Sequence, residues 1–164
     1  MTTVSETTAA PTSMESRGTA AKLFDAIGTI ACLALRFALA IPFFRSGLTK
    51  WDGFLQLSPS TNYLFANEYK LNIFGTAYPF PFPDLMAYAS GLGEIIFPVL
   101  LVLGLATRFA ALGSLFMAGI IFLVYPHTWA NEQLPWAAMA LALIAYGAGK
   151  VSLDYLISRR MGRA

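Results

Sequence analysis

The chain has 164 residues, of which 57% are hydrophobic and only 12% are charged. An ordinary soluble domain carries roughly 25% charged residues, so this composition cannot cover a water-facing surface and indicates an integral membrane protein. A formal net charge of +2, without basic residues interleaved with aromatic ones, gives no basis for nucleic-acid binding, and a single cysteine excludes an internal disulfide.

The chain begins with a polar stretch, residues 1–22, that is rich in Thr, Ser and Ala. It cannot bury enough apolar surface to offset the entropy of ordering, so we expect a disordered tail. The membrane domain is predicted over residues 23–157, and a basic tail over residues 158–164. The first apolar run, at about residues 27–48, is long enough to cross a ~30 Å hydrocarbon core, so we interpret it as a retained span and not as a cleaved signal.

The segment after this span, residues 51–83, is too long for a turn and is dense in aromatic residues. The prolines spaced at its end forbid a helix there. Residues 62–69 could form a short surface helix in the headgroup layer. We therefore predict a long aromatic-rich loop between the first and second spans.

Three further apolar runs follow, at about residues 84–106, 109–125 and 134–150. Only two residues separate the first two of these, which must therefore be antiparallel neighbours. The predicted fold is all-α, a four-helix transmembrane bundle.

The orientation follows from the lysine and arginine residues in the loops, which set topology more strongly than acidic residues do. With four spans, one side has a large excess of these residues: Arg17, Lys22, Arg108, Lys150, Arg159, Arg160 and Arg163, against Lys50 and Lys70 on the other side. All three tryptophans fall at span ends on the side with fewer cations, as expected of rings that settle at the headgroup level. Both termini are predicted to be cytoplasmic, in a bacterial-type inner membrane.

Two charged residues are predicted to lie halfway across the membrane. Arg36 and Glu94 are each about ten residues into their spans, so at ~1.5 Å per residue they reach the same depth from opposite directions. Buried charges are costly unless paired, so we hypothesise an ion pair between them. Ser90 and Gly91 share the face of Glu94 and are small enough to admit a helix or a flat ligand. The pair could instead be a structural clasp without chemistry.

The remaining candidates are weaker. Arg45 should point to another face near the outer boundary and snorkel to water, or form a mouth for an anionic ligand with Lys50 and Asp52. His127, the only histidine, does not make a metal site by itself, so no metal site is predicted. No hydrolase, nucleotide or haem-attachment motif occurs, so the catalytic residues stay unknown and any redox cofactor must be borrowed.

The chain resembles the DoxX family of small four-helix membrane proteins over about residues 33–156. The resemblance rests on motifs distributed along the chain: FRSGLTK (Phe44 to Lys50), GLGEIIFPVLLVLGL (Gly91 to Leu105), TRFAA (Thr107 to Ala111), the pair Tyr125 and Pro126, Trp136, and GAGKVSLD (Gly147 to Asp154). The G-x-G-E…P…G-L-x-T-R string and the G-x-G-x-x-S-L-D ending are its most specific parts. The resemblance implies a four-helix bundle and, for the best-known relatives, the membrane subunit of a thiosulfate:quinone oxidoreductase.

Three functions are compatible with this reading, of which a small-solute or metal transporter ranks last because soft metal ligands are scarce. The first is a quinone-linked redox subunit, with a quinone as its cofactor, that acts with a partner protein on the outer side or in the membrane. The second is a non-enzymatic membrane partner or anchor in a detoxification or metal-handling system. Whether the protein is an enzyme is left open, as is association into a homo-oligomer. The buried polar site is expected at Arg36, Glu94, Arg45, Ser90 and Gly91.

Overall fold

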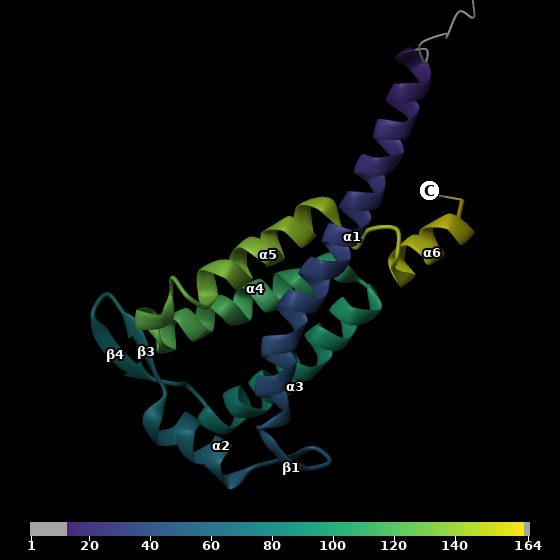
Figure 1. The fold of residues 1–164 in the computed structure, drawn as a ribbon. Coiled ribbons are helices and arrows are strands. Elements are labelled where there is room, and N and C mark those ends of the chain that lie inside the picture. The colour runs from purple at the N-terminus through teal and green to yellow at the C-terminus, as the bar shows by residue number, and fades with distance from the viewer. Residues whose placement is uncertain (1–12, 163–164) are drawn as a thin grey trace, which may run out of the picture.

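The structure, a computed structural model, describes residues 13–162, with side chains from residue 18 onward. Four helices share its main core (Figure 1): α1 (Ser13–Leu48), α3 (Pro83–Leu103), α4 (Thr107–Val124) and α5 (Gln133–Tyr146). The core residues come from all four helices: Leu39, Ala40, Phe43, Leu101, Ala110, Ala111, Ala118, Ala140 and Leu143. Five of these nine are alanines, and side chains this small let the helix backbones approach closely.

Three of these helices, α1, α3 and α4, are long and apolar enough to cross a membrane. The fourth, α5, has 14 residues and is about 21 Å long at ~1.5 Å per residue, which is less than a full hydrocarbon core. Two shorter helices, α2 (Pro59–Tyr63) and α6 (Leu153–Arg160), bring the α-helices of the described part to six. The protein is thus mostly helical, as predicted, but with more helices than the four expected.

The connecting segment, residues 51–82, is not the long loop that was predicted. It contains a hairpin of β1 (Trp51–Gly53) and β2 (Gln56–Leu57), then α2 and a π-helical turn, η1 (Leu64–Glu68), and a second hairpin of β3 (Lys70–Ile73) and β4 (Thr76–Pro79). The strands are two to four residues long, too short for an alternating apolar pattern to reveal them. The short helix suggested for residues 62–69 is present as the end of α2 and η1.

The connecting segment rests on one end of the helices. Phe65 and Phe80 pack with Ala87 of α3 in a second small core. Asn72 Nδ2 donates hydrogen bonds to the carbonyls of Leu123 (3.0 Å) and Val124 (3.3 Å), and so satisfies acceptors that the end of α4 leaves free. We call this the connecting end of the bundle, and the end near α6 the terminal end.

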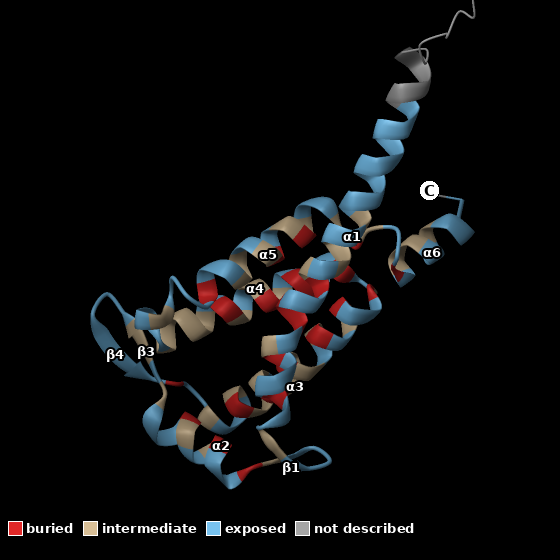
Figure 2. Ribbon diagram, in the orientation of Figure 1, coloured by how far each residue is buried: buried red, intermediate tan, exposed pale blue. Residues whose placement is uncertain are grey.

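At the terminal end, α1 continues well beyond the other helices as an exposed rod (Figure 2). Helical structure crosses both predicted domain boundaries, since α1 begins at Ser13 and α6 ends at Arg160. Residues 13–22, expected in a disordered tail, are therefore helical. The rest of that predicted tail, residues 1–12, lies outside the described residues.

Candidate functional site

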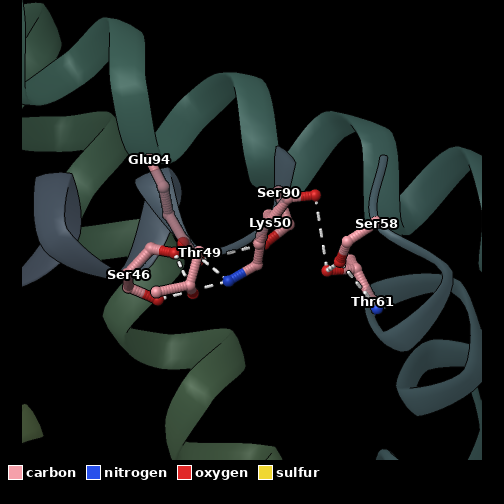
Figure 3. A network of polar contacts seen from close by, with 7 residues as sticks. All are labelled: Ser46, Thr49, Lys50, Ser58, Thr61, Ser90 and Glu94. Atoms are coloured by element: carbon pink, nitrogen blue, oxygen red, sulfur yellow. Dashed lines mark hydrogen bonds and ion pairs between the residues drawn. The ribbon is translucent and has the colours of Figure 1, made fainter. Parts of the chain in front are cut away.

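Glu94 is a buried carboxylate near the middle of α3. The residue is only 3% exposed. Its Oε2 lies 2.7 Å from Lys50 Nζ, and its Oε1 accepts a hydrogen bond of 3.1 Å from Ser90 Oγ (Figure 3). Both oxygens thus have a partner, and one of these partners is a cation whose side chain is itself 13% exposed.

The end of α1 positions Lys50. Two turn hydrogen bonds end the helix, from Thr49 N to the Ser46 carbonyl and from Lys50 N to the Gly47 carbonyl. Lys50 follows this turn, and its Nζ reaches both Glu94 and, at 3.2 Å, the hydroxyl of Ser46. The ammonium group therefore bridges the last turn of α1 and the middle of α3.

Lys50 Nζ can reach Glu94 because α1 and α3 are in close contact. A Cβ atom on Gly47 would lie 2.8 Å from the carbonyl oxygen of Glu94, so only glycine fits at this crossing. That carbonyl is also special within its own helix, because Pro98 has no N–H to donate to it. The proline thus leaves this carbonyl without its helical donor at the point where Gly47 of α1 packs against it.

The predicted ion pair between Arg36 and Glu94 is wrong. In the antiparallel packing of α1 and α3, Gly47 lies beside Glu94, whereas Arg36 lies beside Gly104 at the end of α3. Arg36 and Gly47 are eleven positions apart in α1, about 16 Å at ~1.5 Å per residue. The prediction assumed that the first span ends at the level where the second begins, but the C-terminal end of α1 meets the middle of α3, so Arg36 lies beside the far end of α3.

Arg36 instead binds backbone carbonyls at the terminal end. Nε donates to Leu101 (2.6 Å), Nη2 to Val102 (2.5 Å), and Nη1 to both Ala148 (3.1 Å) and Val151 (2.6 Å). Four of its five N–H groups are thereby used. The residue is 2% exposed, and its contacts tie α1 to the end of α3 and to the chain after α5. We call this set of contacts the arginine hub.

The specific family motifs identified in the sequence meet beside this hub. Gly104 has a φ of +65°, and a Cβ there would lie 2.6 Å from Ser152 Cβ and 2.7 Å from Arg36 Nη2. Asp154 accepts hydrogen bonds from the amides of Ala106 (2.7 Å) and Thr107 (2.9 Å) at the start of α4. The carboxylate thus satisfies free donors at a helix N-terminus, where negative charge is favoured. These motif residues build a helix junction.

Lys50 and Glu94 line a cavity of about 670 Å³ at the connecting end. Its other polar walls are Ser46, Ser90, Tyr69, Tyr125 and Glu132. Aromatic side chains form much of the remainder: Phe43, Phe65, Phe80, Phe97, Phe116 and Trp136. A few polar groups in a mostly apolar wall are typical of a small-molecule site. A second cavity, of about 1030 Å³, lies at the terminal end, where its ion pair of Asp25 and Lys150 is half exposed.

Tyr69 brings the connecting segment into the cavity wall. Burial, and then its hydrogen bond with Tyr125, raise the pKa of Tyr69 well above its usual range. The two rings meet edge to face with centroids 5.8 Å apart. A hydrogen bond between two phenols uses the O–H of one of them, so Tyr69 and Tyr125 together keep one O–H group to donate into the cavity that both residues line.

The predicted site residues fall into three groups. Glu94 and Ser90 line the cavity together, as their shared helix face predicted. Gly91 faces the Trp51 ring, which would lie 2.7 Å from an added Cβ, so an indole and not a ligand fills that space. Arg36 and Arg45 do not line this cavity, since Arg36 belongs to the hub and Arg45 is exposed.

Sequence reasoning missed two parts of the site. These are Lys50, the partner of Glu94, and the aromatic side chains that the connecting segment adds to the cavity wall. Lys50 was considered only as part of an outer mouth, because it lies beyond the end of the first span. Phe65, Tyr69 and Phe80 come from a segment whose fold has no clear periodic signal. The aromatic density of that segment was the only sequence signal that pointed to them.

Comparison with known proteins agrees with the motifs. The DoxX family profile matches residues 31–126. A relative, an uncharacterized protein of Haemophilus influenzae, is 33% identical over 142 residues, which cover 79% of this chain and 85% of that protein. No solved structure matches. With a family profile across more than half of its length and apolar helices long enough to span a bilayer, the chain is a membrane protein that belongs to the DoxX family.

Proposed function

We propose that this DoxX-family protein is a quinone-linked redox subunit of the membrane, and that the cavity beside Lys50 and Glu94 receives the quinone headgroup. The single observation that carries the proposal is the buried ion pair in the cavity wall, with 2.7 Å between Nζ and Oε2. Burying two charges is costly, and apolar side chains of similar size often stabilise a fold as well. A paired lysine and carboxylate in a cleft are therefore better accounted for by a functional role.

The residues present fit such a ligand. A quinone headgroup is a flat ring with carbonyl acceptors, and the cavity offers aromatic walls with Lys50 and Tyr69 as donors. A volume of about 670 Å³ lies within the ~300–1,000 Å³ usual for small-molecule sites. Lys50 and Tyr69 would hold the carbonyl oxygens, and the aromatic residues would contact the ring.

The polar residues also suggest how protons move. A bound quinone takes up electrons and protons when it is reduced. The carboxylate of Glu94 lies in the cavity wall, and its contacts continue through Lys50 Nζ to Ser46, which is exposed. Lys50 would thus connect the buried carboxylate with the surface at the connecting end. Because the sequence has no redox motif, the electrons would come from a partner protein. The protein could also associate with a second copy of itself.

The membrane arrangement that we propose is a four-helix bundle of α1, α3, α4 and α5 in the inner membrane, with both termini in the cytoplasm. The excess of lysine and arginine at the terminal end supports it. Alkaline phosphatase, which is active only outside the cytoplasm, should be inactive when fused after residue 164. An active fusion would show that the C-terminus lies outside the cytoplasm, opposite to the proposed orientation.

The ligand proposal can be tested with a matched pair of variants. Lys50→Met removes the buried ammonium, whereas Lys70→Met removes an exposed one from β3, outside the cavity. The purified proteins are extracted with solvent for bound quinone, and a soluble quinone analogue is titrated while tryptophan fluorescence is recorded, since Trp136 lines the cavity. We expect quinone in the wild type and in Lys70→Met, and loss of binding in Lys50→Met.

Ser90→Ala is a second probe in case Lys50→Met folds poorly. It removes one hydrogen bond to Glu94 and leaves the ion pair in place. We expect it to weaken binding of the analogue without abolishing it. Wild-type protein that neither carries quinone nor binds the analogue would falsify the proposal and favour a non-enzymatic membrane partner.

A further inference from the structure

Two hairpin tips on the connecting segment carry fully exposed aromatic side chains. Phe54, at the tip between β1 and β2, is 93% exposed, and Phe74, at the tip between β3 and β4, is 104% exposed. Leu55, next to Phe54, is 48% exposed. The two hairpins extend to different sides of the bundle at its connecting end (Figure 1). Side chains this exposed bury almost no apolar surface within the protein.

Local backbone preference does not account for these residues either. Leu55 has a φ of +56° and Phe74 a φ of +48°, both in the left-handed region. Tight hairpin turns with positive φ favour glycine, asparagine or aspartate, and a bulky residue there is unusual. An apolar side chain at each tip thus carries a local conformational cost, which a contact outside this chain would offset.

The depth of both tips is fixed by hydrogen bonds to the ends of the spans. Asn72, two residues before Phe74, donates to the carbonyls of Leu123 and Val124 at the end of α4. On the other hairpin, the Leu55 carbonyl accepts from the Tyr88 hydroxyl at 3.4 Å, and Tyr88 lies in the second turn of α3. Both hairpins are therefore tied, close to their tips, to the parts of α3 and α4 that face the connecting segment.

We propose that the tips at Phe54, Leu55 and Phe74 insert into the headgroup layer of the leaflet at the connecting end. A bilayer surrounds the bundle, so it can receive tips on different sides, whereas one soluble partner would cover a single side. Aromatic and aliphatic side chains at span ends are stable in this layer. Membrane insertion would anchor the connecting segment, which contributes Phe65, Tyr69 and Phe80 to the cavity wall. The proposal is independent of the quinone and of which end faces the cytoplasm.

The test places a spin label at each tip in the full chain. Cys32 is the only cysteine, so Cys32→Ser provides the background for Phe54→Cys and Phe74→Cys, and Glu68→Cys labels an exposed polar position of the same segment as a control. The labelled proteins are reconstituted into phosphatidylcholine and phosphatidylglycerol vesicles. Electron paramagnetic resonance then compares collisions with oxygen, which concentrates in lipid, and with a water-soluble nickel complex.

We expect the ratio of oxygen to nickel accessibility to be several times higher at positions 54 and 74 than at position 68. All three positions are on the surface, so labelling should preserve folding, which elution as a single species checks. Equal ratios at the three positions would overturn the proposal. So would dipolar broadening between labels on different molecules, because the tips would then contact a second copy.

Discussion

The two ends of the bundle each contain a buried cation, but they satisfy it in different ways. At the terminal end, Arg36 is surrounded by four backbone carbonyls, which cannot ionise. At the connecting end, Lys50 is paired with the carboxylate of Glu94 in the wall of a cavity. The first arrangement has one protonation state and joins three segments of chain. The second pairs two side chains of opposite charge beside a space large enough for a ligand.

This comparison shows that burial of a charge does not by itself identify a functional site. Both residues are largely hidden from solvent, and both lie on or directly after α1. What separates them is the chemistry of the partner and the presence of a neighbouring cavity. The variants below test this distinction, since they should affect stability at one end and ligand binding at the other.

The largest effect is expected from Arg36→Met. Methionine donates no hydrogen bond, so several carbonyls would be left buried without their partner, at a cost of about 3–5 kcal/mol of unfolding free energy. Unfolding in mixed detergent and dodecyl sulfate micelles measures this cost. Arg45→Met, an exposed arginine on the same helix, is the control and should change stability little. Equal stability of the two variants would show that the hub is not structural.

A smaller effect is expected at the ion pair. Lys50→Met leaves the Glu94 carboxylate buried without its cation and should cost about 3 kcal/mol. Adding Glu94→Gln removes that unpaired charge, so the double variant should be more stable than Lys50→Met alone. The coupling between the sites should be about 1–3 kcal/mol in the same unfolding assay. Strictly additive effects would contradict the pairing of these side chains.

The smallest effect is expected from Gly104→Ala, at about 1–3 kcal/mol. A methyl group there meets both Ser152 and the guanidinium of Arg36, and the left-handed backbone is unfavourable for alanine. Gly119→Ala is the matched control, because nothing lies within 4 Å of an added Cβ at that position. The control should unfold at the same dodecyl sulfate fraction as the wild type or at a slightly higher one. A Gly104→Ala variant that matches it would place the close approach of these residues in doubt.

Much of the fold was predictable because it depends on local properties. Long apolar runs give the positions of α1, α3, α4 and α5, and the short link at Thr107 and Arg108 makes α3 and α4 antiparallel neighbours. The connecting segment was less predictable. Its hairpins have strands of two to four residues, and their tips hold Leu55 and Phe74 in a backbone conformation that usually takes glycine, asparagine or aspartate.

The candidate site was only half predictable. Glu94 could be identified as a buried charge from its place in an apolar span, and Ser90 from the helical period. Lys50 could not be matched to it, because the pairing depends on how far α1 slides along α3. Gly47 sets that register through its close contact with the Glu94 carbonyl, and the two residues are far apart in the chain.

The amino-acid sequence by itself determined that the protein lies in a membrane, where its apolar helices run, and that Arg36 and Glu94 are buried, since each of these follows from composition and spacing along one helix. Only the tertiary structure decided which partner each charge has. The physical reason is that the C-terminal end of α1 meets the middle of α3 and not its start, so equal distances from the span ends do not mean equal depth. Packing at Gly47 and Gly104, not sequence position, brings Lys50 to Glu94 and Arg36 to the carbonyls at the end of α3.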